Sequence, residues 1–155
     1  MLVILHSGQT GVERGAHRGA LATGLPVAGF MPLDRRDELG PVPPEVADLL
    51  TACFERGPRP AVRANVALAS GVVVAVPDRS QAAKYTAMGA MLAAVRAAGI
   101  PWLAADPKLD LDDVAAWVRA LPETSGSTRI MVTGPRGTRW HDGEVFAMRL
   151  VANLA

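Results

Sequence analysis

The 155-residue sequence has one cysteine, no excess of charge of either sign and no long apolar run. A single cysteine, Cys53, excludes an intrachain disulfide framework and a multi-cysteine zinc cluster. The 16 basic and 15 acidic residues give a formal net charge of +1, which argues against a protein that wraps nucleic acid or lies on an anionic membrane. The longest apolar stretch, residues 66–77, is broken by Ser70 and Gly71 and is too short to span a membrane. These absences predict a cytoplasmic protein that binds neither nucleic acid nor membrane.

The sequence is otherwise rich in apolar residues. Half of its residues are hydrophobic and a fifth are charged, as in globular domains that bury a substantial core. One domain is the expectation at this length, so we predict a single ligand-binding domain over residues 1–155. Short β-rich runs alternate with Ala-rich segments, which is typical of βα units around a parallel sheet. We therefore expect one doubly wound α/β domain with a mostly parallel, five-stranded sheet.

The expected elements follow from this alternation. Strands are predicted at residues 2–6, 26–30, 72–76, 102–105 and 129–133. Helices are predicted at residues 11–23, 44–55, 84–98, 110–121 and 142–154, with a short one at 61–69. Gly24 and Gly99 lie where helix C-termini need a left-handed residue, and a proline follows each within two positions. The long irregular segment at 31–43 is rich in proline and charge, and such loops are usually functional or mobile.

Two glycine-containing loops follow predicted strands, and backbone amides in such loops can approach an anion closely. The first reads Ser7-Gly8-Gln9-Thr10-Gly11 and matches neither the Walker A loop nor the dinucleotide fingerprint. The second reads Thr133-Gly134-Pro135-Arg136-Gly137-Thr138, in which Arg136 offers a planar donor pair suited to phosphate or carboxylate. Because parallel strands end at one edge of a sheet, the loops would share a ligand if their strands are neighbours. The alternatives are that the first loop is only a tight turn and that Arg136 is solvated.

Other polar residues give weaker signals. Arg63 and Asn65 precede the third predicted strand but would not share a helix face, because they are two positions apart. The three histidines are scattered, so we expect structural or solvated roles for them and no metal site. Ser7 lacks the Gly-x-Ser-x-Gly elbow, and no acid and base pair can be named, so we predict no catalytic residue. Cys53 is expected to be a buried, unreactive thiol in the helix predicted at 44–55.

Four short motifs occur in order along the chain. They are Ser7-Gly8-Gln9-Thr10-Gly11-Val12-Glu13-Arg14, then Gly29-Phe30-Met31-Pro32 with Arg35-Arg36, then Arg63-x-Asn65-Val66, and finally Gly134-Pro135-Arg136. Together they resemble the motifs of the molybdenum-cofactor carrier family, whose members open on Gly-Gly-Gln-Thr-Gly-Val-Asp-Arg. The resemblance extends over nearly the whole chain.

This resemblance implies a single Rossmann-like domain, related to the Lonely Guy phosphoribohydrolases and to nucleotide-sensing proteins. It also implies a phosphorylated ligand, for which a nucleotide, a pterin nucleotide and the molybdenum cofactor are the candidates. The ligand-facing positions that it implies are Ser7, Gly8, Gln9, Thr10, Gly11, Arg14, Arg36, Arg63, Asn65, Thr86, Gly134 and Arg136.

We therefore expect a binding or carrier protein for a phosphorylated, nucleotide-like small molecule. The alternative is a phosphoribohydrolase that acts on nucleoside monophosphates, but the Gly-rich, Glu-bearing stretch of the Lonely Guy enzymes does not occur between residues 76 and 91. A third hypothesis is a structural or interaction subunit without a working site. We also expect a homo-oligomer, because the helix predicted at 84–98 carries only Lys84 and Arg96 as charges and is apolar on all sides. The alternative is that neighbouring helices of the same chain cover it.

Overall fold

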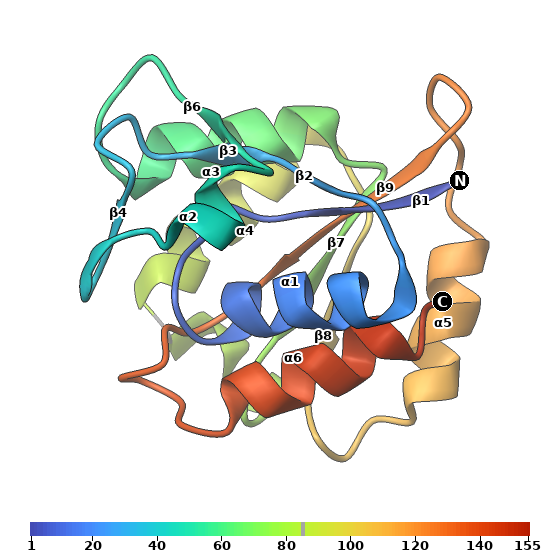
Figure 1. Ribbon diagram of the computed structural model, residues 1–155. Helices are drawn as coiled ribbons and strands as arrows, with labels where there is room; N and C mark the ends of the chain where they lie inside the picture. Colours follow the sequence, from blue (N-terminus) through green and yellow to red (C-terminus); the bar gives the residue numbers. More distant parts are fainter. Residues whose placement is uncertain (85) are drawn as a thin grey trace.

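Five short strands form a parallel sheet through the centre of the protein (Figure 1). The computed structural model describes residues 1–84 and 86–155, without the side chains of residues 86 and 87. In sheet order the strands are β2 (Val27–Ala28), β1 (Leu2–Leu5), β9 (Thr128–Thr133), β7 (Gly71–Ala75) and β8 (Trp102–Ala105). All of their pairings are parallel. The predicted five-stranded parallel sheet is confirmed.

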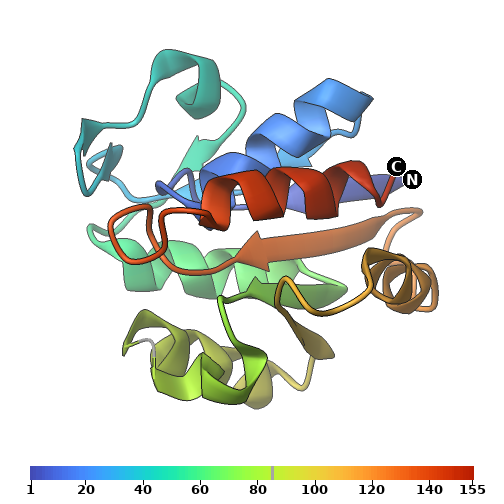
Figure 2. The same ribbon diagram turned by 90° about the horizontal axis from the view of Figure 1, so that it is seen from below.

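Helices cover both faces of this sheet (Figures 1 and 2). One face carries α1 (Val12–Thr23), α5 (Leu111–Arg119) and α6 (Gly143–Ala152), and the other carries α3 (Pro58–Leu68) and α4 (Thr86–Ala98), which follows the 3₁₀ turn η1 (Arg79–Lys84). Successive side chains of β7 point to opposite faces, so Val73 packs in the first core and Val72 and Val74 pack in the second. The predicted α/β domain, wound on both faces, is thus confirmed. No helix in the described part of the chain has the length and hydrophobicity that crossing a membrane requires.

The segment between β2 and α3 differs from its prediction. The strand expected at 26–30 divides at Gly29 into β2 and β3 (Phe30–Met31), and β3 pairs in parallel with β6 (Thr51–Ala52). The helix predicted at 44–55 is therefore wrong beyond α2 (Pro44–Ala47). The backbone amides that would continue it are used otherwise, because Thr51 donates to Gly29 at 2.9 Å and Cys53 donates to Met31 at 2.8 Å.

Cys53 consequently lies after a short strand rather than in a helix. Its side chain is buried, as expected, and burial together with the nearby Glu55 charge raises the pKa of the thiol. The irregular segment predicted at 31–43 contains a small antiparallel hairpin, formed by β4 (Arg36–Asp37) and β5 (Gly40–Pro41). This hairpin lies beside the C-terminal edge of the sheet (Figure 1).

Helices α1 and α6 lie side by side because α1 presents glycine to α6 (Figure 2). A Cβ at Gly15 would lie 2.1 Å from the carbonyl oxygen of Glu144, and one at Gly19 would lie 2.5 Å from that of Met148. Neither distance is compatible with a side chain, so the interhelical spacing depends on these two positions. The spacing matters to the site because α1 begins at the first glycine loop.

We predict that Gly15→Ala destabilises the protein by about 1–3 kcal/mol, because the added methyl group forces α1 and α6 apart. The matched control is Gly89→Ala on α4, where a Cβ would meet no atom of the described residues within 4 Å. There the higher helix propensity of alanine should leave the free energy of unfolding equal or raised by up to about 1 kcal/mol. Urea denaturation of both variants measures the difference, and equal effects would contradict this account of the helix pair.

Candidate functional site

The two glycine loops lie together because their strands are neighbours in the sheet. β1 pairs with β9 in parallel register, Leu5 opposite Met131, so both chains leave the sheet at the same edge. The amide of Val12 donates to the carbonyl of Pro135 at 3.4 Å. A Cβ at Gly11, whose φ is +77°, would lie 2.6 Å from both the carbonyl oxygen of Pro135 and the nitrogen of Gly137. The condition for a shared ligand, that the two strands are neighbours, is met, and the backbones of the two loops are in direct contact.

A buried pair of histidines, His6 and His17, supports the first loop. His6 Nδ1 accepts a hydrogen bond from the amide of Gly8 at 2.9 Å, and His6 Nε2 lies 3.0 Å from His17 Nδ1. Since Nδ1 of His6 accepts, its Nε2 must carry the proton and donate to His17. Burial lowers the pKa of His6 to about 3, and the charges of His17 and Arg14 act in the same direction. Both histidines therefore have the structural role that we expected.

A buried carboxyl group ties the first loop to the end of β9. Glu13 Oε1 accepts from the amide and the hydroxyl of Ser7, both at 2.6 Å, and its Oε2 lies 3.2 Å from Thr133 Oγ1. Burial raises the pKa of Glu13, against the effect of the Ser7 and Thr133 hydrogen bonds. The hydroxyl of Ser7, a predicted ligand group, is thus directed at Glu13 in this structure.

Arg14 connects α1 and the first loop to the hairpin. Its Nη2 donates to the carbonyl of Gly8 at 2.9 Å and to Asp37 Oδ2 at 2.8 Å. The two charged side chains are 15% and 4% exposed, so their ion pair is shielded from water. Asp37 Oδ1 in turn accepts from the amides of Leu39 and Gly40, at 2.8 and 3.1 Å. Arg14 and Asp37 therefore connect the turn of the hairpin to the first loop.

Asn65 joins two of the sequence motifs to each other. Its buried amide accepts from the nitrogen of Phe30 at 2.8 Å and donates to the oxygen of Phe30 at 3.0 Å. A Cβ at Gly29 would lie 2.9 Å from Asn65 Oδ1, so the glycine makes room for this contact. Arg63 is 62% exposed and lies 3.8 Å from Glu55. Neither Asn65 nor Arg63 lines the hollows described next.

Two hollows of about 200 and 270 Å³ lie beside the two glycine loops, at the C-terminal edge of the sheet. Gln9, Arg36 and Arg136 line the first, and Thr10, Gly11 and Arg14 line the second. Six of the twelve predicted positions thus come together. The side chain of Thr86 lies outside the described residues, and the remaining positions contribute to the surrounding backbone or lie away from the hollows. Within the described ranges, no group of three or more His, Cys, Asp or Glu side chains could hold a metal ion.

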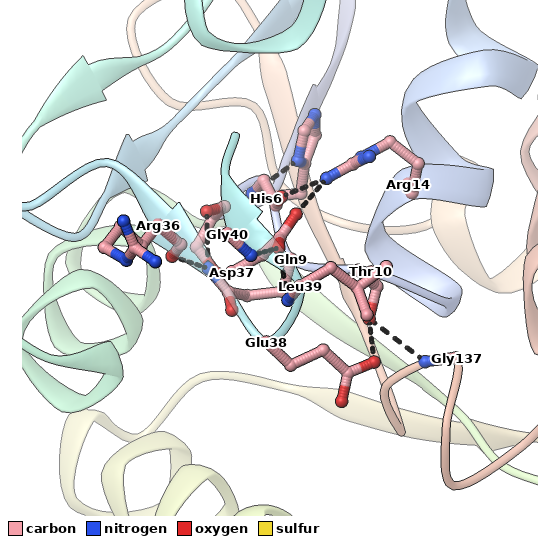
Figure 3. A network of polar contacts seen from close by, with 12 residues as sticks. His6, Gln9, Thr10, Arg14, Arg36, Asp37, Glu38, Leu39, Gly40 and Gly137 are labelled. Carbon is pink, nitrogen blue, oxygen red and sulfur yellow. Dashed lines mark hydrogen bonds and ion pairs between the residues drawn. The ribbon is translucent and has the colours of Figure 1, made fainter. Parts of the chain in front are cut away.

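Glu38, which the sequence did not single out, lines both hollows. Figure 3 shows its side chain directed at Thr10. Its carboxylate accepts from Thr10 Oγ1 at 2.5 Å, from the amide of Thr138 at 3.3 Å and from Thr138 Oγ1 at 2.6 Å. Thr10 Oγ1 in turn accepts from the amide of Gly137 at 3.2 Å. Burial acts to raise the pKa of Glu38, but these hydrogen bonds and the charge of Arg136 lower it overall. The loops can evidently hold an anion.

Glu38 and Thr138 belong to the site, but the sequence contained only weak indications of this. Glu38 belongs to the polar segment at 31–43, whose length and composition suggested function, but no spacing rule relates that segment to the loops. Thr138 ends the second glycine loop and is two positions from Arg136, so it could have been included with it.

The buried His6 predicts how stability depends on pH. The unfolded chain protonates this histidine near pH 6.5, whereas the folded protein keeps it neutral to about pH 3. Between those values the unfolded state binds more protons, so the free energy of unfolding falls as the pH falls, by up to about 1.4 kcal/mol per pH unit. His6→Asn should keep an acceptor for the Gly8 amide and make this dependence shallower between pH 6.5 and 5. Denaturant titrations over that range measure it, with the exposed His141→Asn as control. An unchanged slope in His6→Asn would contradict the assignment.

Comparisons with known proteins agree with this fold. The chain is similar to a crystal structure of a protein from Syntrophus aciditrophicus SB named "Putative molybdenum carrier protein", with a TM-score of 0.79 and 20% identity. The match covers 99% of this chain and 94% of that chain. A search of curated proteins found no match. Residues 4–155 match the family model described as the circularly permutated YpsA SLOG family. The resemblance inferred from the motifs is thus confirmed, and the chain belongs to the circularly permutated YpsA SLOG family.

Proposed function

We propose that this protein binds a phosphorylated, nucleotide-like small molecule at the two glycine loops. The observation that carries the proposal is the set of donors that hold the Glu38 carboxylate, namely the hydroxyl groups of Thr10 and Thr138 and the amide of Thr138. Hydroxyl and backbone amide donors at the end of a parallel sheet are the groups that commonly bind phosphate oxygens. A ligand phosphate would accept from the same groups.

Two guanidinium groups support this assignment. Arg136 and Arg36 both line the smaller hollow, and no ion pair engages either of them within the described residues. Arginines without an ion-pair partner favour an anionic ligand over a neutral one, because charge-assisted hydrogen bonds are the stronger kind, and they do so in a hollow that Asp34, Asp37 and Glu38 also line. The rest of a nucleotide or pterin nucleotide would extend along the hollow toward Pro32 and Pro58.

The protonation and position of Glu13 and Glu38, at the C-terminal edge of the sheet, favour ligand binding over hydrolysis. Glu38 faces the hollows, but its lowered pKa keeps it ionised and unable to protonate a leaving base. Glu13 has a raised pKa, but its carboxyl is buried against Ser7 and Thr133. A carrier or sensor role therefore fits the geometry better than the phosphoribohydrolase alternative.

The molybdenum cofactor named in the resemblance would be cargo for such a carrier. The phosphate of a pterin nucleotide would lie against Thr10, Thr138 and Arg136, as any nucleotide phosphate would. The proposed ligands are therefore phosphorylated small molecules as a class. We also predict that the protein is cytoplasmic, as expected from the sequence.

We predict that Arg136→Ala weakens binding of guanosine 5′-monophosphate by about 1.5–3 kcal/mol, the scale of a lost charge-assisted hydrogen bond. The thermal stability of the free protein should change little, because no ion pair within the described part of the chain uses this side chain. Isothermal titration calorimetry measures the affinity. The matched control is Arg139→Ala, which removes an exposed arginine that directly follows this loop and lines neither hollow.

Unchanged affinity in Arg136→Ala would mean that Arg136 faces solvent and would contradict the proposed site. Chromatography of the same mixtures tests the alternative function. Free guanine and ribose 5-phosphate well above a control without protein would identify a phosphoribohydrolase. No binding of the nucleotide to the unmodified protein or to a variant in which Glu38 is replaced, together with no turnover, would favour the structural or interaction subunit.

We propose that the outer face of α4 forms the subunit interface of the predicted homo-oligomer. The large side chains Met88, Met91, Leu92 and Val95 are buried in the core, which accounts for much of the helix's apolar character. Its exposed positions include the small residues Gly89, Ala90, Ala93 and Ala97. We predict that Ala93→Arg shifts the protein toward a monomer, measured by multi-angle light scattering at micromolar concentration. A clean 16.2 kDa monomer for the unmodified chain would remove the prediction.

A further inference from the structure

Glu38 makes the contacts that a bound anion would make, although it is part of the protein itself. All three of its hydrogen bonds come from the two glycine loops, and both carboxylate oxygens are used. The donors belong to segments about 30 and 100 residues away in sequence, since the contact separations are 28 and 100 positions. Figure 3 shows the side chain reaching from the hairpin toward Thr10 and Gly137. The carboxylate is therefore a stand-in for one face of a phosphate group.

The hairpin does not depend on this contact for its own structure. The neighbouring Asp37 fixes the turn through Arg14 and through the amides of Leu39 and Gly40. Gln9 Nε2 adds a hydrogen bond to the carbonyl of Arg36 at 3.2 Å. Leu39, on the other side of Glu38, is 79% exposed. Rotation of the Glu38 side chain toward solvent would leave all of the hairpin contacts named here in place.

The hollows give a second, independent reason to expect that rotation. Glu38 is a wall of both, and each alone is smaller than the roughly 300–1,000 Å³ of typical small-molecule pockets. Because Glu38 lines both hollows, turning its side chain outward would enlarge the space beside the glycine loops.

Charge prevents Glu38 and a phosphate group from sharing the donors. Two anions a few ångströms apart repel strongly in a partly buried site, and the ligand would need the three hydrogen bonds that Glu38 accepts. A neutral ligand offers these donors only uncharged acceptors, which form weaker hydrogen bonds than the Glu38 carboxylate does, so it competes poorly for them. The site would thus discriminate against nucleosides that lack the phosphate.

We propose that Thr10, Thr138 and Arg136 form the phosphate subsite and that Glu38 is its built-in competitor, which a phosphate monoester displaces and an unphosphorylated molecule does not. This inference rests on the proposed function and adds the specificity-determining residue to it. The apparent affinity for phosphate is then the intrinsic affinity multiplied by the fraction of molecules in which Glu38 has turned out.

The test compares Glu38→Gln with the unmodified protein by calorimetric titration of inorganic phosphate, GMP and guanosine. If Glu38 occupies the donors in nine of ten molecules or more, its replacement should tighten phosphate and GMP binding by about tenfold or more. Binding of guanosine should change less than twofold, so that the preference for GMP over guanosine rises. Glu38→Ala repeats the test without a side chain that could form new hydrogen bonds, and thermal denaturation checks that both variants are folded.

The matched control is Asp34→Asn. Asp34 lines the smaller hollow with Glu38, but none of its hydrogen bonds goes to the glycine loops within the described residues. The Asp34→Asn substitution removes the same charge from the same hollow without freeing Thr10 or Thr138. We therefore expect a gain in phosphate and GMP affinity well below that of Glu38→Gln. An equal gain in Asp34→Asn would overturn the inference, because general electrostatics would then explain both.

The outcomes separate this inference from the proposed function. Binding of GMP to the unmodified protein, with equal or weaker binding in both Glu38 variants, would overturn the inference and leave the proposed function intact. Failure of GMP and phosphate to bind the unmodified protein and every Glu38 variant would overturn both. Binding that is seen only after Glu38 is replaced would support both.

Discussion

The parallel pairing of β1 with β9 places the two glycine loops backbone to backbone, and the remainder of the site is arranged around that contact. The chain ends of the domain contribute these neighbouring strands, so residues 6–11 and 134–138 meet although they are far apart in sequence. Gly11 leaves no room for a side chain beside Pro135, and the Val12 amide is used by the second loop. The Val12 amide joins the two loops, and the hydroxyl groups of Thr10 and Thr138 are donors that hold an anionic group, the Glu38 carboxylate.

Several residues at positions that the family resemblance assigns to the ligand instead form hydrogen bonds within the protein in this structure. Asn65 holds the backbone of Phe30, and Arg14 holds Gly8 and Asp37. A residue that recurs in a motif can therefore secure the geometry of a site without touching the ligand. The same reasoning applies to Ser7, whose hydroxyl and amide are directed at the buried Glu13.

The sequence predicted the sheet and most helices because their signals are local. Apolar runs, helix-ending glycines and the βα alternation each depend on neighbouring residues, and β8 was predicted with its observed bounds. The second half of the helix expected at 44–55 failed because Thr51 and Cys53 pair with the distant residues Gly29 and Met31. Glu38 was missed for the same reason: its partners lie 28 and 100 positions away, and no local pattern records such a contact. The loops themselves could be inferred, whereas what fills the space between them required the fold.

The most direct test of this account follows individual amides by NMR spectroscopy while inorganic phosphate is added to the uniformly ¹⁵N-labelled protein. The account predicts saturable shifts that are concentrated at Thr10, Gly137 and Thr138, with a further change at Leu39 as Glu38 turns outward. The amide of Phe30, which Asn65 holds, should stay unmoved. Shifts that are scattered over the surface, or confined to segments away from the two glycine loops, would contradict the assignment of the phosphate subsite.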